Sequence, residues 1–208
     1  MNFNFNKHPE LEGKHAFLSP SKVGWLNYDD EKLVASYINS YSQSIGTLLH
    51  IYAQEHINYG IKINKGTKNE VLLYLMKNGI PACAIDIEFI FPNLMNYVND
   101  AIGYRMTTEQ PLVYSNFCFG TADTICFKNN FLRIHDLKTG TSPVHMEQLI
   151  KYEALFCLEY VIKPSDIDSE LRIYQGGNIE VYKPTPNEVM KVCDIIVHES
   201  NILTNITG

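Results

Sequence analysis

The chain has 208 residues, of which 45% are hydrophobic and 19% are charged. This length and composition favour one globular domain and argue against long disordered segments. The net charge of -6 argues against a protein that coats nucleic acid over a large area, although it is compatible with a small basic groove.

The sequence shows no sign of a membrane or secretory segment. No apolar run approaches the ~18–20 residues of a membrane-spanning helix, and the N-terminus does not have a charged stretch followed by an apolar one. The five cysteines are odd in number and include no CxxC pair, so we expect reduced thiols rather than a metal centre. We therefore expect a cytoplasmic protein with no membrane partner.

The first hundred residues have mostly helical patterns. Serines on both sides of a proline predict a helix that begins near Ser21. An apolar stripe predicts a second helix that contains His50 and ends around Gly60, and residues 68–79 predict a third that ends at Asn78 and Gly79. Residues 82–91 alternate like a strand but precede a helical pattern, so their type stays open; there the alternation favours a solvated strand face.

From Gln110 onward the pattern changes to β, with strands expected at 111–120, 122–128 and 131–138. A buried helix over 145–162 follows, then a hairpin over 170–184 that turns at 176–178, and a terminal helix with Thr185 as cap. The fold class is therefore α/β (α+β) in a single domain, with a central mixed sheet flanked by helices. Its parts are a helical N-terminal part (15–105), a sheet and helix (109–163), and a C-terminal hairpin and helix (170–204).

Two aspartates are expected to meet across the central hairpin. Asn129 and Asn130 suit a two-residue turn with positive φ angles, which places Asp123 opposite Asp136 on one face. Cross-strand Cβ atoms are then roughly 4.5–5.5 Å apart, a distance at which like charges destabilise a sheet. A divalent cation such as Mg²⁺ would offset this repulsion, with the carbonyl of Leu137 as a further ligand.

A lysine and two further polar residues complete the constellation. Lys138 lies two residues after Asp136, on the same face, beside any water that a metal activates. Gln148 and Tyr152 are four residues apart and project from one face of the following helix. The same residues also fit an ordinary surface Asp-Lys pair, a glutamine at the solvent edge and a core tyrosine.

The segments "GTAD" (120–123), "HDLKTG" (135–140) and "QLIKY" (148–152) resemble the PD-(D/E)XK nuclease superfamily, specifically its RecB-like branch with lambda exonuclease and many phage relatives. The resemblance implies a restriction-endonuclease-like core and a phage-encoded protein. It also implies roles for the matching residues: Asp123 and Asp136 bind metal, Lys138 is catalytic, and Gln148 and Tyr152 support the site.

Upstream residues extend the resemblance. The segment "GTLLH" (46–50) is similar to the helix whose histidine adds a metal ligand in RecB-like enzymes, which implies that role for His50, although Gln54 stands where relatives often carry a glutamate. Glu109 resembles an acidic residue near the site of some relatives and is expected to support the metal ligands indirectly. "WLNYDD" lacks the cysteines of relatives with an iron-sulfur cluster, so no such cluster is expected.

The function implied by this resemblance is a deoxyribonuclease that depends on Mg²⁺ or Mn²⁺ and hydrolyses phosphodiester bonds. We expect an exonuclease of phage recombination or DNA processing, acting on linear double-stranded DNA in the bacterial or phage-infected cytosol. A recombination or replication protein could be a partner, and the sequence leaves the oligomeric state open. An RNA endonuclease of the cap-snatching type and a non-catalytic nuclease fold that binds DNA or protein also fit the sequence.

Overall fold

The structure, a computed structural model, describes residues 6–207. The chain divides into two units, residues 1–41 and 42–208, so the helical part expected from residue 15 is split after Tyr41. The described part of the first unit holds two short 3₁₀ helices, Pro9–Leu11 and Trp25–Asn27, and one α-helix, α1 (Asp30–Asn39). Within it, the rings of Phe17 and Tyr37 meet edge to face at 5.2 Å.

The helix expected from Ser21 is not formed, and this prediction was wrong. The hydroxyl groups of Ser19 and Ser21 bond to each other at 2.8 Å instead of capping a helix, and the Ser21 N–H donates to Ser19 Oγ. The first α-helix begins only at Asp30, where Asp29 Oδ1 accepts from the Lys32 N–H at 2.7 Å. A carboxylate at this position satisfies a backbone donor of the first turn, which a Ser-Pro-Ser turn does not do.

The second unit opens with three α-helices, α2 (Ser42–Tyr59), α3 (Lys68–Lys77) and α4 (Ile87–Tyr104). The predicted ends of the first two are confirmed, because Gly60 and Gly79 follow them with φ angles of +67° and +88°. A left-handed residue after a helix lets the chain turn back, and glycine adopts this conformation without a steric penalty.

The strand face favoured for residues 82–91 was wrong. This stretch forms a 3₁₀ turn, Ala82–Ala84, and then the start of α4. Asp86 is the N-cap of α4, and its Oδ1 accepts from the Phe89 N–H at 3.1 Å. Glu88 lies in the first turn and pairs with Lys68 of α3. The alternating acids therefore mark a helix start, where negative charge is favourable.

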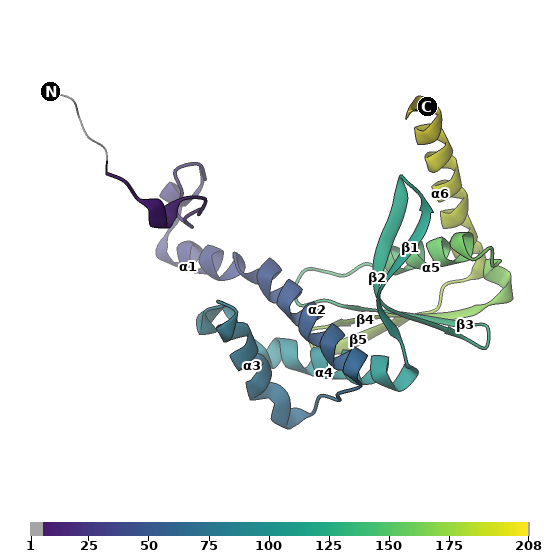
Figure 1. Ribbon diagram of the computed structural model, residues 1–208, viewed down its shortest axis with the longest axis horizontal. Helices are drawn as coiled ribbons and strands as arrows, with labels where there is room; N and C mark the ends of the chain where they lie inside the picture. Colours follow the sequence, from purple (N-terminus) through teal and green to yellow (C-terminus); the bar gives the residue numbers. More distant parts are fainter. Residues whose placement is uncertain (1–5, 208) are drawn as a thin grey trace. The chain divides into compact units, whose positions relative to one another are not determined.

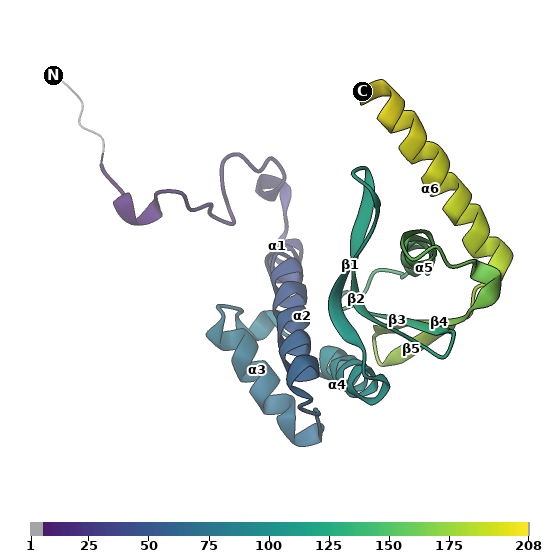
Figure 2. The same ribbon diagram turned by 45° about the vertical axis from the view of Figure 1, so that its right-hand side comes forward.

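A five-stranded mixed sheet follows the helices, in the order β1-β2-β3-β4-β5. Strands β1, β2 and β3 are antiparallel, β3 and β4 are parallel, and β5 is antiparallel to β4. Helix α5 connects the parallel pair, and α6 ends the chain (Figures 1 and 2). The bounds are β1 Thr107–Ser115, β2 Cys118–Lys128, β3 Phe131–Leu137, α5 Glu147–Glu159, β4 Asp168–Gln175, β5 Asn178–Tyr182 and α6 Pro186–Thr207.

Helices cover both faces of the sheet, with α5 and α6 on one side and α4 on the other (Figure 2). On the α5 side, Leu132 and Ile134 of β3 pack with Leu171 and Ile173 of β4 in the core. The predicted α+β fold with a mixed sheet, flanking helices and a helical N-terminal part is confirmed. This arrangement places the ends of β3 and β4 beside the start of α5.

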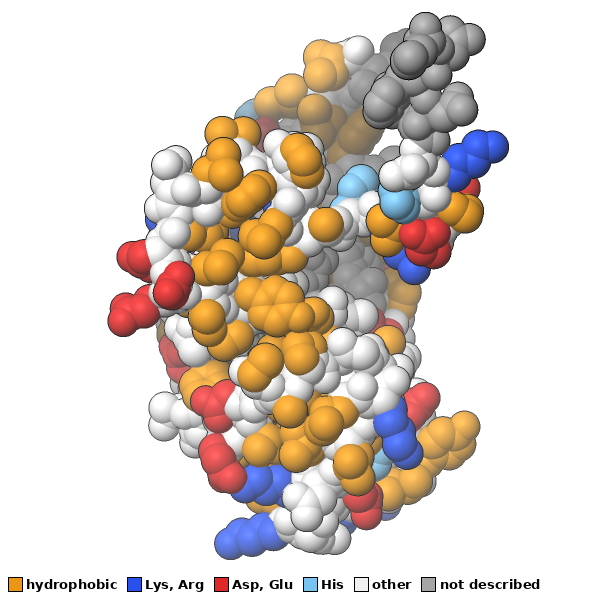
Figure 3. Space-filling model, turned by 90° about the vertical axis from the view of Figure 1, so that its left-hand side faces the viewer, with side chains coloured by type: hydrophobic (Ala, Val, Ile, Leu, Met, Phe, Trp, Pro, Cys, Tyr) orange, Lys and Arg blue, Asp and Glu red, His pale blue; other side chains and the backbone are white. Residues whose placement is uncertain are grey.

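Exposed apolar side chains remain on the helical part of the chain. Figure 3 shows many hydrophobic side chains on the face that it presents, with acidic side chains at both edges and few lysines or arginines. Ile51, Leu73 and Met76 are among the exposed apolar residues of α2 and α3. Such a face would attract a phosphate backbone only weakly. Within residues 6–207, no helix combines the length and apolar character needed to cross a membrane.

Candidate active site

The hairpin between β2 and β3 has the register that the sequence predicted. Asn129 and Asn130 form its turn, with φ angles of +53° and +57°, as a two-residue hairpin turn with positive φ at both positions requires. The Cα pairs of the ladder include Ile125 with Ile134 and end with Thr124 and His135. The next residues along this ladder, Asp123 and Asp136, therefore lie opposite each other.

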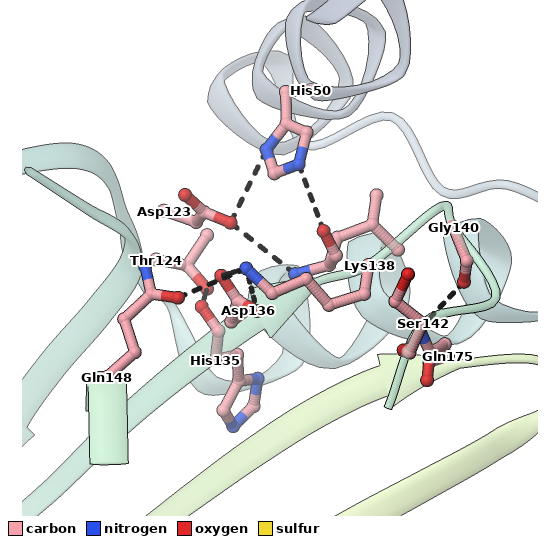
Figure 4. A network of polar contacts seen from close by, with 11 residues as sticks. His50, Asp123, Thr124, His135, Asp136, Lys138, Gly140, Ser142, Gln148 and Gln175 are labelled. Carbon is pink, nitrogen blue, oxygen red and sulfur yellow. Dashed lines mark hydrogen bonds and ion pairs between the residues drawn. The ribbon is translucent and has the colours of Figure 1, made fainter. Parts of the chain in front are cut away.

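His50 of α2 reaches the same place from another element (Figure 4). Its Nδ1 is 3.4 Å from Asp123 Oδ2, and its Nε2 is 3.0 Å from the carbonyl oxygen of Leu137. In the tautomer with hydrogen on Nε2, this nitrogen donates to the carbonyl and the Nδ1 lone pair faces the carboxyl group. The neighbouring Leu49 is completely buried, which fixes this part of α2 in the core.

The carboxyl group of Asp136 is held by Lys138. Lys138 Nζ lies 3.1 Å from Asp136 Oδ1 and 2.9 Å from Oδ2, and it also donates to Gln148 Oε1 at 3.2 Å. The backbone N–H of Lys138 donates to the Tyr174 carbonyl at 3.0 Å, so this residue continues the pairing of β3 with β4. Helix α5 and the end of β3 thus orient one ammonium group together.

The loop after Lys138 is held by the end of β4. Gln175 Nε2 donates to the carbonyl oxygens of Gly140 at 2.7 Å and Ser142 at 2.9 Å (Figure 4). Gln175 was not predicted from the sequence as part of the site. It is the last residue of β4, in the hairpin expected over 170–184, and no feature of the sequence placed that strand beside Lys138.

Two carboxyl groups share this partly buried place with a single ammonium group. Burial, the charge of Asp136 and a hydrogen bond between the two side chains together raise the pKa of Asp123 to about 8. The Leu137 N–H, which donates to Asp123 Oδ2 at 3.4 Å, acts in the opposite direction. Asp136 has a side-chain exposure of 7%. The site therefore favours a proton or a cation on Asp123 near neutral pH.

Glu109 of β1 lies closer to the predicted metal ligands than its sequence position suggested. One ligand atom each from His50, Glu109 and Asp123 lies within 4.8 Å of the others, and within residues 6–207 these three form the one such group of histidine, cysteine and acidic side chains. Glu109 has a φ of +50°, an uncommon value for a residue with a side chain. Strained residues of this kind cluster at functional sites.

The predicted pair on α5 is divided between two places. Gln148 contacts Lys138, whereas the ring of Tyr152 lies against Gly120 of β2. A Cβ atom added at Gly120 would be 2.9 Å from Tyr152 Cε1. Tyr152 also lines an apolar cavity on the far side of Gln148. The structure thus brings His50, Asp123, Asp136, the Leu137 carbonyl, Lys138 and Gln148 together, with Glu109 beside them, and sets Tyr152 apart.

The opposite face of β3 carries a polar cluster that fixes the strand behind the site. The Tyr174 hydroxyl donates to Asp100 Oδ2 at 2.7 Å and lies 3.2 Å from His135 Nδ1. His135 is completely buried. Burial, together with the charges of Arg172 and Arg133, lowers its pKa to about 3. A neutral imidazole therefore stands next to Asp136 in the chain and adds no positive charge to the site.

Neither the protein-family models nor the curated protein sequences compared with this chain match it. The resemblance to PD-(D/E)XK nucleases consequently rests on the short motifs and on the geometry of their residues.

Proposed function

We propose that this protein is a metal-dependent nuclease that hydrolyses DNA phosphodiester bonds. One observation carries the proposal: His50 from α2, Asp123 from β2 and the segment Asp136–Lys138 from β3 converge where β2 and β3 separate. Carboxylates, a carbonyl oxygen and an imidazole around one point are a set of metal ligands, and an adjacent ammonium group suits a phosphate.

The ligand atoms fit a divalent cation of the Mg²⁺ or Mn²⁺ type. Asp123, Asp136 and the Leu137 carbonyl supply hard oxygen atoms, while the His50 nitrogen favours Mn²⁺ as well. Glu109 is a further ligand of this set. A cation bound there would lower the pKa of a coordinated water and polarise a phosphate oxygen. Burial and the charge of Asp136 raise the pKa of Asp123, and a bound cation would favour its charged form.

Lys138 is the group that would act on the phosphate. Its ammonium group is oriented by two acceptors, Asp136 and Gln148, and its three N–H groups can donate to a phosphate oxygen or to the attacking water. A fixed positive charge near the developing negative charge lowers the barrier because it needs no reorganisation during the reaction. Gln148 is then a positioning residue that acts through Lys138.

The order of the motifs supports DNA over RNA as the substrate. The intact set of site residues supports a phage-encoded exonuclease of the cytoplasm over a non-catalytic binding protein. Incubation of the purified protein with end-labelled linear DNA, circular DNA and RNA, each with Mg²⁺ or Mn²⁺, tests these choices. We expect degradation of linear DNA. Degradation of RNA alone would favour the endonuclease of the cap-snatching type, and metal binding without any cleavage would favour a binding module.

The Lys138→Ala variant should lose at least ~100-fold in cleavage rate, a typical cost of removing a group that stabilises transition-state charge. Lys163→Ala is a matched control, because Lys163 is an exposed lysine remote in sequence from the motifs. Thermal unfolding of both variants reports on the fold. A folded Lys138→Ala protein that cleaves DNA at the rate of the control would refute the mechanism.

Gln148→Ala should lower kcat by roughly tenfold and leave KM nearly unchanged, since the side chain orients Lys138 rather than binding substrate. Gln148→Glu restores an acceptor for the ammonium group and should recover part of the rate. A rise in KM without a change in kcat would show instead that Gln148 binds substrate directly.

A further inference from the structure

An apolar cavity of about 470 Å³ lies between the β1–β2 hairpin, α5 and α6. This volume is in the range of ~300–1,000 Å³ that is usual for pockets that bind small organic groups. Its walls are formed by apolar side chains of α6 and aromatic residues of the hairpin and α5. Among the lining residues are Phe117, Phe119, Tyr152, Leu155, Ile196 and Leu203.

This cavity adjoins the candidate active site. Gln148 and Lys151 line it, and both also line a second cavity, of about 460 Å³, that contains Lys138. Gln148 is therefore a common wall, with its Oε1 3.2 Å from Lys138 Nζ. Along β2, Gly120 is three residues from Asp123, which corresponds to about 10 Å in a strand. A neighbouring nucleotide of a bound strand can span such a distance.

Part of the aromatic surface that lines the apolar cavity is exposed to solvent. Phe117 and Phe119 are 44% and 68% exposed. The close approach of the Tyr152 ring to Gly120 sets a third aromatic group into the wall. Exposed aromatic rings beside cations are the arrangement that proteins use for unpaired bases, because every base has an apolar face and every linkage carries a negative charge.

We propose that this cavity binds an unpaired base of the strand that is cut, next to the phosphate at Lys138, while Lys151 contacts the adjoining phosphate. The inference rests on the proposed nuclease function and adds a substrate class to it. A base within a continuous duplex has both faces covered by its neighbours and cannot enter such a cavity. The strand must therefore be single-stranded, or locally unpaired, where it is cut.

Charge complementarity favours a nucleic acid over an apolar protein segment as the occupant. Lys151 lines both cavities and Lys138 lines the second. These two lysines can contact neighbouring phosphates, whereas an apolar helix or strand would offer them no negative charge. Glu199, which also lines the cavity, can accept a hydrogen bond from the amino group of a base edge.

The test uses an end-labelled single-stranded oligonucleotide in which each base in turn is removed to leave an abasic position. Loss of one stacked base should slow cutting at the adjoining phosphate by roughly 5- to 150-fold. Phe117→Ala and Phe119→Ala should each slow cutting of the intact strand and reduce the penalty of the abasic position, because they remove the same contact. Tyr59→Ala is the control, since Tyr59 is 78% exposed and lines neither cavity.

Binding of the same strand, measured by fluorescence anisotropy without a catalytic metal, reports on the cavity separately from hydrolysis. Binding that depends on Phe117 or Phe119, without any cleavage, would refute the nuclease and support the base site. Cleavage that is equal for intact and abasic strands and for all three variants would refute the base site and leave the nuclease standing. Phenylalanine variants that change the oligomeric state in ultracentrifugation, but not DNA binding, would assign the cavity to contacts between copies and overturn the inference.

Discussion

The raised pKa of Asp123 predicts how the metal-free protein responds to pH. In the folded protein this carboxyl group keeps its proton up to about pH 8, whereas its ordinary pKa is 3.8. The folded state therefore binds a proton that the unfolded chain has released, and the free energy of unfolding falls as the pH rises from about 4 to 8. The change in pKa sets an upper limit of about 6 kcal/mol, and we expect about 2–4 kcal/mol after local relaxation.

Asp123→Asn removes this titration. We expect the free energy of unfolding of the wild type to fall by about 2–4 kcal/mol relative to the variant between pH 4 and pH 8, because asparagine stays neutral. Urea unfolding with a chelator, at several pH values, measures the difference. Glu180→Gln, at an exposed position of β5, should follow the wild type. Parallel curves for wild type and Asp123→Asn would show that the pKa of Asp123 is not raised in the folded protein.

A bound metal ion should offset the negative charge of the Asp123 and Asp136 carboxylates. At pH 8, Mn²⁺ should raise the free energy of unfolding of the wild type in proportion to the logarithm of its concentration above the Kd. Asp123→Asn should respond much less, since it has lost a charged ligand. Equal stabilisation of both proteins would place the cation elsewhere, and the proposed metal centre would then be wrong.

Three substitutions away from the proposed metal site test the packing and burial around it. Gly120→Ala should lower the free energy of unfolding by about 1–3 kcal/mol, since the added Cβ would be 2.9 Å from the Tyr152 ring. Gly103→Ala in α4 is the control: its added Cβ meets open space, and it should raise the free energy of unfolding by about 0.5–1 kcal/mol. Similar unfolding midpoints for the two variants would contradict the close contact. Glu153 is 2% exposed, and burial raises its pKa to about 7, so its contribution to stability falls as the pH rises from 4.5 to 7. Glu153→Gln should therefore be more stable than the wild type above pH 7 by up to about 3 kcal/mol, and a difference that is the same at pH 5 and pH 8 would refute this.

The parts of the fold that local chemistry determines could be predicted from the sequence. Asn129 and Asn130 determine a turn, the turn determines the register of β2 and β3, and the register brings Asp123 to Asp136. The end of α2 at Gly60 follows in the same way from one residue type. In each case the residue type strongly favours one backbone conformation, with positive φ, at that place in the chain.

The start of α4 was missed because the same residues fit both the alternation of a strand and the spacing of a helix. Ile85, Ile87 and Phe89 alternate with acids, but Ile90 and Leu94 are the residues that the core buries, and this spacing is helical. Over so short a stretch, the spacing of apolar residues does not distinguish a helix from a strand. The decisive feature is the Asp86 side chain, which accepts from a backbone N–H that a strand would pair differently.

The backbone conformation of Glu109 is a part of the site that could not be predicted from the sequence. The β1–β2 register places Glu109 opposite Asp123, between the pairs Thr108–Thr124 and Gln110–Ala122. A two-residue turn at 116–117 alone would pair Glu109 with Thr124, because the register shifts by one residue between Val113 and Ser115. The left-handed φ of +50° has no sequence signal, because glutamate in a strand favours an extended backbone. Only the surrounding sheet holds this conformation, at a cost of about 1–3 kcal/mol. Glu109 is thus a third carboxylate near His50 and Asp123, and it would be available to the proposed cation.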